Sequence, residues 1–187
     1  MKLPHRKPLR LPEYDYSQPG AYFVTICTKG RECSLGYIQG EEMRFSLYGE
    51  IAAQGWDFTS NHFQRLELDW WVVMPNHVHA LIVIQDSSKG SVLQPTPAVS
   101  IEATNLPIPP QSLLAKVVAH YKYHTTKKIN LARNLSGERF WQRNYYEHVV
   151  RSHESMQKIQ EYILANPMRW NEDQLNPSAP PNQFNQQ

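Results

Sequence analysis

The stretch LELDWWVVMPNHVHALIVI, residues 66–84, decides the fold. It contains two runs rich in β-branched and aromatic residues, 66–74 and 78–84, with Pro75 and Asn76 between them. Both residues favour turns: proline fixes φ, and the asparagine side chain hydrogen-bonds to its own backbone. The stretch therefore predicts two antiparallel strands joined by a tight turn.

The rest of the chain supplies strands and helices around this hairpin. Predicted strands cover residues 21–28 and 145–150, and residues 34–38 and 43–46 form either a second strand or a short hairpin. Predicted helices cover residues 47–62, 111–130 and 153–166, and the last one stops before Pro167. Central antiparallel strands with helices packed on them predict an α+β fold with a ferredoxin-like antiparallel sheet.

The length and composition predict one domain with appendages. A chain of 187 residues that is 41% hydrophobic is long enough to bury a core. We expect a basic N-terminal arm over residues 1–20, a folded domain over 21–170 and a flexible loop at about 86–110. The polar, proline-containing tail at 171–187 is expected to be disordered. Cys27 and Cys33 form neither a disulfide framework nor a zinc ribbon.

Basic residues are unevenly distributed, although the net charge is only +2. No carboxylate lies between Glu102 and Glu138. That interval contains the cations Lys116, Lys122, Lys127, Lys128 and Arg133. The first ten residues contain Lys2, Arg6, Lys7 and Arg10. Such a pattern fits a surface that follows phosphates. A solvated helix face explains it equally well.

His77 and His79 form the sharpest local signal. Residues i and i+2 of a strand point to the same side, so both imidazoles project together while Val78 points to the opposite face. Two adjacent imidazoles are half of a metal site. From this motif alone, a solvated surface pair remains the alternative.

The last predicted helix offers partners for these histidines. Tyr162 and Asn166 are four residues apart and lie on one side of the helix, at the flank of its apolar stripe. A tyrosine in that position can reach the sheet without being fully buried. A tyrosine at the edge of the core, followed by an asparagine C-cap, is the alternative.

Three motifs in order resemble those of the REP-associated tyrosine transposases. They are MPNHVHALI (74–82), WQRNYYEH (141–148) and YILANP (162–167), and the opening RKPLRLPEYDYSQPGAYFVTICT (6–28) is also similar. These proteins are domesticated relatives of HUH-type insertion-sequence transposases with one catalytic tyrosine. The resemblance spans about residues 6–170 and implies the HUH endonuclease and transposase fold.

The resemblance also implies a role for each site residue. His77 and His79 match the metal ligands, Tyr162 matches the nucleophile, and Asn166 stands where insertion-sequence relatives carry glutamine as third ligand. The asparagine is usual for the REP-associated branch but has a shorter reach. Tyr145 and Tyr146 are competing nucleophiles; we rank them lower because they fit a structural strand and neither has an amide four residues on.

The implied reaction is the nicking and rejoining of hairpin-forming single-stranded DNA. Tyr162 would form a 5′-phosphotyrosine and free a 3′-hydroxyl, helped by Mg²⁺ or Mn²⁺, with zinc as runner-up metal. The arm of Lys2, Arg6, Lys7 and Arg10 would read a guide sequence. Further DNA contacts are expected from Lys116, Lys122, Lys127 and Arg143, and base stacking from Tyr123 or Trp141, although Trp141 fits the core better.

The sequence leaves two other functions open. One is a protein that binds DNA hairpins without cutting them, and the other is a metal-dependent phosphoesterase. The sequence does not decide between a monomer and a homodimer. It shows no signal peptide and no apolar stretch long enough for a membrane span, so we expect a soluble cytoplasmic protein.

Overall fold

The computed structural model describes residues 18–86 and 112–179. The basic arm with Lys2, Arg6, Lys7 and Arg10, most of the expected 86–110 loop and the end of the tail lie outside these residues. In the described part, none of the helices has the length and apolar character that crossing a membrane requires.

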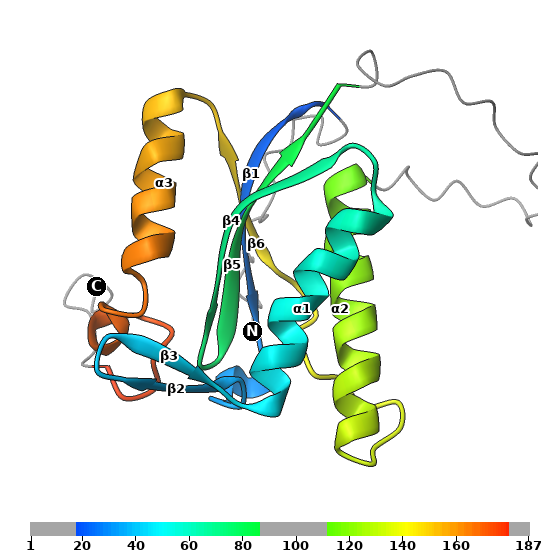
Figure 1. The fold of residues 1–187 in the computed structure, drawn as a ribbon, viewed down its shortest axis with the longest axis vertical. Helices are drawn as coiled ribbons and strands as arrows, with labels where there is room; N and C mark the ends of the chain where they lie inside the picture. The colour runs from blue at the N-terminus through cyan, green and yellow to red at the C-terminus, as the bar shows by residue number, and fades with distance from the viewer. Residues whose placement is uncertain (1–17, 87–111, 180–187) are drawn as a thin grey trace, which may run out of the picture.

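A four-stranded antiparallel sheet forms the centre of the molecule (Figure 1). Its strands are β1 (Gly20–Cys27), β4 (Leu66–Met74), β5 (His77–Ile84) and β6 (Tyr146–Val150), in the order β4-β5-β1-β6. The hairpin predicted from residues 66–84 is confirmed, because β4 and β5 pair with Met74 opposite His77. The other edge of β5 pairs with β1, which places Thr25 opposite His79 and Cys27 opposite His77.

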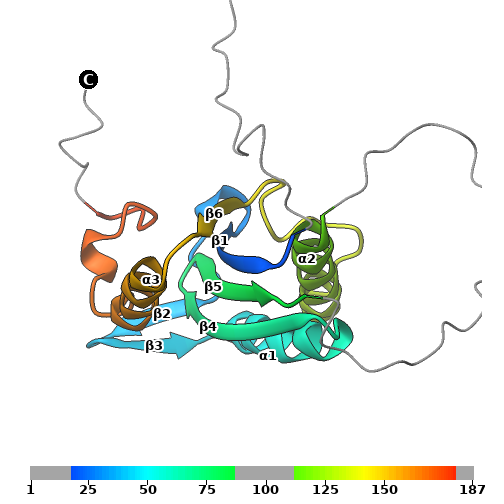
Figure 2. The same ribbon diagram turned by 90° about the horizontal axis from the view of Figure 1, so that it is seen from above.

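Three long helices cover the sheet from both sides. α1 (Leu47–His62) and α2 (Leu113–Ala132) pack on one face, and α3 (His153–Ala165) lies on the other (Figure 2). α2 begins two residues after the predicted start, because the Ser112 side chain accepts a hydrogen bond from the backbone N–H of Ala115 and caps the helix there. The predicted α+β class is confirmed.

The alternation along β1 and β5 divides the core into two layers. Tyr22, Val24 and Ile26 of β1 are buried in the large layer under α1 and α2. Ala21 and Phe23 point the other way, into a small layer that contains Leu81 and Ile163 of α3. Since His77 and His79 are in phase with Leu81 on β5, they lie on the α3 side of the sheet.

The structure decides the open alternative at residues 34–46 and corrects the expectation of a disordered tail. Residues 34–46 form a separate hairpin, with β2 (Gly36–Gln39) paired to β3 (Glu42–Phe45). The tail, expected to be disordered from residue 171, is instead folded in turns as far as residue 179, starting with the short helix η3 (Trp170–Glu172). The Asn76 side chain holds it by donating a 2.6 Å hydrogen bond to the carbonyl of Leu175.

Candidate metal and tyrosine site

His77 and His79 come together as the sequence predicts, but inside the protein rather than on a solvated face. Their exposed fractions are 0% and 3%. The Nε2 atoms lie 3.1 Å apart, so both imidazoles present the same nitrogen to one point. A solvated surface pair, the alternative left open by the motif, does not describe these residues.

Each histidine is oriented by a partner at its other nitrogen. Nδ1 of His77 donates to Oδ1 of Asn76 at 2.8 Å. Nδ1 of His79 lies 2.9 Å from Oγ1 of Thr25, the residue paired with it across the strands. Metal-binding histidines commonly have such a partner, because it fixes the ring orientation and leaves the second nitrogen for the ion.

Burial keeps both histidines neutral. It lowers the pKa of His77 well below its ordinary value, and the neighbouring His79 and then Arg31 lower it further. The pKa of His79 falls to about 3, chiefly because of burial, although a backbone hydrogen bond at Val24 raises it. Since metals bind the neutral imidazole, protons compete little for these nitrogens near neutral pH.

Asp173 is the third member of this cluster, and it was not among the residues predicted from the sequence. Its Oδ2 lies 3.7 Å from Nε2 of His77, and donor atoms of Asp173, His77 and His79 all lie within 4.8 Å of one another. Two neutral imidazoles and a carboxylate fit a divalent ion and leave coordination positions open. An aspartate in a polar tail carries no spacing signal that predicts this placement.

Asn166, the predicted third ligand, lies in the same pocket. It is the C-cap of α3 and is 2% exposed. Its Oδ1 is buried and has no hydrogen-bond partner in residues 18–86 and 112–179. An unpaired buried amide oxygen costs free energy unless another group, such as a cation, satisfies it.

Tyr162 lies next to the histidine pair. Its hydroxyl is 3.4 Å from Nε2 of His79, and its side chain stays 39% exposed. Burial raises the pKa of Tyr162, and the Asp173 charge adds to this effect. A hydrogen bond with Asn166 and the charge of Arg169 oppose the rise in pKa. The phenol is therefore protonated at neutral pH unless another charge acts on it.

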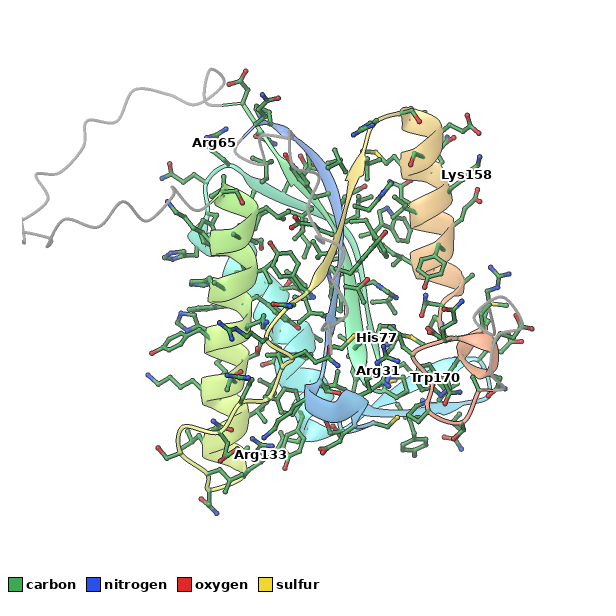
Figure 3. All side chains as sticks on the ribbon, turned by 180° about the vertical axis from the view of Figure 1, so that it is seen from behind. Arg31, Arg65, His77, Arg133, Lys158 and Trp170 are labelled. Atoms are coloured by element: carbon green, nitrogen blue, oxygen red, sulfur yellow. The ribbon has the colours of Figure 1, made fainter. Side chains whose placement is uncertain are left out.

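His79, Asp173, Asn166 and Tyr162 line a pocket of about 700 Å³, whereas His77 is fully buried behind them. Tyr145 and Tyr146, the competing nucleophiles, line it together with Tyr162. Arg31, Gln142 and other polar side chains complete the wall. Figure 3 shows His77, Arg31 and Trp170 gathered at the end of the sheet where the C-terminal segment returns. The volume is in the range of pockets that hold small organic ligands.

A second groove, of about 900 Å³, lies along α2 and the loop that follows it. It contains three of the predicted DNA-binding residues, Lys122, Lys127 and Arg143, and Gln142 lines both this groove and the Tyr162 pocket. Lys128, which belongs to the basic interval noted in the sequence, also lines it, as does Arg139, which the sequence did not single out. Lys116 is exposed on α2 but does not line the groove.

Two predicted DNA contacts have structural roles. Nζ of Lys122 donates to the carbonyls of Gln142 and Arg143 at 2.6 and 3.0 Å, which ties the loop to α2. Trp141 is 1% exposed and its indole donates to Oγ1 of Thr125 at 2.8 Å, so the core interpretation is confirmed. Tyr123 is 63% exposed beside the groove and is available for stacking.

The chain is similar in sequence to a known protein and similar in fold to a solved structure. An uncharacterized protein of Haemophilus influenzae is 37% identical over 172 residues, which cover 91% of this chain and 93% of that protein. No protein-family model matches the chain.

Among solved structures, a REP-associated tyrosine transposase bound to a REP hairpin is 17% identical and superposes with a TM-score of 0.55. The match covers 85% of this chain and 74% of that one. A Deinococcus radiodurans structure is 21% identical, covers 83% of this chain and 95% of its own, and has a TM-score of 0.41. The first of these two matches shows that the chain has the fold of a REP-associated tyrosine transposase.

Proposed function

This chain belongs to the same family as the Haemophilus influenzae protein, and we propose that it is a metal-dependent transposase that nicks and rejoins single-stranded DNA. The observation that carries the proposal is the 3.4 Å distance between the Tyr162 hydroxyl and Nε2 of His79. A partly exposed phenol beside a cluster of buried metal-binding groups fits nucleophilic attack on a phosphodiester.

His77, His79 and Asp173 would hold the ion, and the unpaired Oδ1 of Asn166 supplies a further oxygen donor. A bound Mg²⁺ or Mn²⁺ supplies positive charge that offsets the charge developing on the phosphate. Two imidazoles and two oxygen donors suit Mn²⁺ at least as well as Mg²⁺, and zinc remains the runner-up.

The covalent step is an exchange of two phosphate esters. Oη of Tyr162 forms a bond to phosphorus while the bond from phosphorus to the 3′-oxygen breaks. The proton lost by the phenol balances the proton gained by the released 3′-oxygen, which becomes a hydroxyl. The 5′ side stays attached as a phosphotyrosine. Because one ester replaces another, attack by a 3′-hydroxyl reverses the step and rejoins strands without ATP.

The substrate we propose is a single strand that folds into a hairpin. The solved transposase of this fold was bound to a REP hairpin. In this chain, Lys127, Lys128, Arg139 and Arg143 line the groove on α2 and can bind backbone phosphates, and Tyr123 can stack on an unpaired base. The basic arm, Lys2, Arg6, Lys7 and Arg10, stays proposed as the reader of a guide sequence.

The contact between Tyr162 and His79 lies within one chain. α3 packs on its own sheet, which supports a site whose nucleophile and metal ligands come from the same copy. We therefore propose catalysis in cis, by a monomer or by a homodimer with two independent sites. The catalytic unit would include residues 171–179, since Asp173 lies there.

The test is capture of a covalent protein–DNA adduct. Labelled hairpin-bearing single strands are incubated with Mn²⁺ and the wild type, Tyr162→Phe or His77→Ala, and then resolved on denaturing gels. The expected result is an adduct that Tyr162→Phe, His77→Ala and a chelator each abolish. An adduct that survives in Tyr162→Phe would move the nucleophile to Tyr145 or Tyr146.

The same experiment separates the alternative functions. A hairpin-binding protein that does not cut would retain the labelled strand on native gels but never give an adduct. A phosphoesterase would release product without a covalent intermediate. Either result would overturn the proposed nicking and rejoining.

A further inference from the structure

Two arginines line the Tyr162 pocket, and neither side chain forms a hydrogen bond or a close ion pair in the described part of the chain. Arg31 ends the short helix η1 (Lys29–Arg31) after β1, and Arg169 follows α3. Within residues 18–86 and 112–179, neither guanidinium forms a hydrogen bond or an ion pair. Two exposed cations from distant parts of the sequence thus face one pocket.

The backbone at Arg31 is held in an uncommon conformation. Its φ is 58°, in the left-handed region, and Gly30 before it has a φ of 69°. A non-glycine residue there costs on the order of 1 kcal/mol, and such strain gathers at functional sites. The Arg31 carbonyl accepts a 3.1 Å hydrogen bond from Nδ2 of Asn76, the residue whose Oδ1 orients His77. The turn that carries Arg31 is therefore fixed to the histidine cluster.

The two guanidinium charges act on different groups of the site. Arg31 contributes to lowering the pKa of His77 and also acts to lower that of Asp173, whereas Arg169 opposes the rise in the pKa of Tyr162. Figure 3 shows Arg31 beside His77 at the end of the sheet. The opposing acids of the pocket are Glu172 and Asp173, and the proposed metal would engage Asp173.

We propose that Arg31 and Arg169 bind the non-bridging oxygens of the phosphodiester that Tyr162 attacks. The inference rests on the proposed function and assigns the groups that receive the phosphate. Guanidinium groups bind phosphate oxygens through two parallel hydrogen bonds, which orients the phosphorus as well as neutralising its charge. As Oη bonds to phosphorus and the 3′-oxygen leaves, negative charge grows on these oxygens, and fixed cations stabilise it.

The test removes the charge from the substrate and from the protein in turn. A hairpin oligonucleotide is made with a natural linkage or a methylphosphonate, which replaces one non-bridging oxygen by an uncharged methyl group, at the scissile position. Affinities are measured by fluorescence anisotropy, with chelator present, in the Tyr162→Phe background so that no cleavage occurs. The proteins are this background alone and with Arg31→Gln, Arg169→Gln or Lys158→Ala.

Lys158 is the matched control, because it is an exposed cation that pairs with Glu154 and lies on the outer side of α3, away from Arg31 (Figure 3). We expect the methylphosphonate to weaken binding about tenfold in the background and in Lys158→Ala, but less than about twofold in Arg31→Gln and Arg169→Gln. A difference in the affinity of one protein for the two oligonucleotides cannot come from misfolding, since a folding defect weakens the binding of both oligonucleotides alike.

Two results would overturn the proposal that Arg31 and Arg169 bind the scissile phosphate. One is equal affinity of the background for both linkages, and the other is an undiminished methylphosphonate effect in both arginine variants. Either result leaves adduct formation by the wild type untouched, so failure of this proposal is distinguishable from failure of the proposed function. Absence of an adduct in the wild type would instead remove the proposed function itself.

Discussion

Nε2 of His77 lies 3.1 Å from Nε2 of His79, while the Nδ1 atoms of the same rings are held by Asn76 and Thr25. The arrangement follows from β5 and its neighbours: consecutive inward residues of one strand supply the rings, the hairpin turn supplies Asn76 and β1 supplies Thr25. Two nitrogen lone pairs at this distance are favourable only with a proton or a metal ion between them.

Loss of the Thr25 hydroxyl should weaken metal binding without disturbing the sheet. Thr25→Val keeps the β-branched shape but leaves Nδ1 of His79 without its side-chain partner. Substitutions of such partners typically lower metal affinity by about 10–100-fold, and we expect a loss in this range for Mn²⁺. Titration calorimetry measures it, and unchanged affinity would show that Thr25 does not orient the ring.

The pH dependence of folding should report the two buried histidines. Their pKa values are lowered in the native state, His79 to about 3, whereas the unfolded chain takes up protons near the ordinary value of 6.5. Above pH 6.5 neither the folded nor the unfolded state binds protons at these histidines, so they add no pH dependence to stability. As the pH falls below about 6.5, the unfolded state alone binds protons, so the free energy of unfolding should fall by up to about 1.4 kcal/mol per pH unit for each histidine.

Urea unfolding in chelator between about pH 7.5 and pH 5 measures this slope. The matched protein is His77→Gln/His79→Gln, in which both groups are gone and the slope should flatten. His120, whose pKa is also lowered by burial, and Asp173, whose pKa is raised by burial, remain in both proteins and contribute to the residual slope. Equal slopes in the two proteins would contradict the assignment of buried neutral imidazoles.

Asp173→Asn should lower metal affinity while keeping the C-terminal segment in place. Oδ1 of Asp173 accepts a 2.7 Å hydrogen bond from the Leu175 N–H, which an asparagine oxygen can still accept, while Oδ2 faces His77. The variant thus removes the charge and keeps the turn. We expect Mn²⁺ affinity to fall by about tenfold or more, since carboxylate charge sets the affinity for hard cations. An undiminished affinity would exclude Asp173 as a ligand.

The sequence predicted what local periodicity determines. The 66–84 hairpin and the shared side of His77 and His79 follow from strand alternation, and the position of Tyr162 beside the apolar stripe follows from helical spacing. Asp173 was missed because its position depends on a contact between Asn76 and Leu175, 99 residues apart. Such long-range contacts leave no mark in a single sequence, and the same holds for the pairing of β6 with β1.

Asn166→Leu should cost the metal-free protein little stability and the metal-bound protein more. Without metal, Oδ1 of Asn166 is buried and unpaired in the described part of the chain, so its removal should cost little beyond the hydrogen bond to Tyr162. With saturating Mn²⁺, the wild type should gain more stability than the variant, because the variant binds the ion more weakly. Thermal unfolding with and without Mn²⁺ measures both, and an equal Mn²⁺ gain would show that Asn166 is not a ligand.

Gly55→Ala should destabilise the packing of α1 on α2. A Cβ atom at Gly55 would lie 2.4 Å from Cγ2 of Thr125 and 3.0 Å from Cε2 of Tyr121, so the helices must move apart. Alanine gains about 1 kcal/mol in helix propensity, but overpacking of this kind typically costs about 1–3 kcal/mol, and here the contact is shorter than van der Waals distance. We expect a net loss of about 2 kcal/mol in urea unfolding.

A second substitution makes this last prediction specific. Thr125→Ser removes the Cγ2 atom that a new Cβ would meet, but it keeps the Oγ1 that accepts from the Trp141 indole at 2.8 Å. Gly55→Ala/Thr125→Ser should therefore recover part of the lost stability, whereas Gln54→Ala, at an exposed neighbouring position on α1, should change it little. Recovery implies that close helix approach, rather than glycine's flexibility, is what the fold requires at residue 55. A Gly55→Ala protein as stable as the wild type would contradict that requirement.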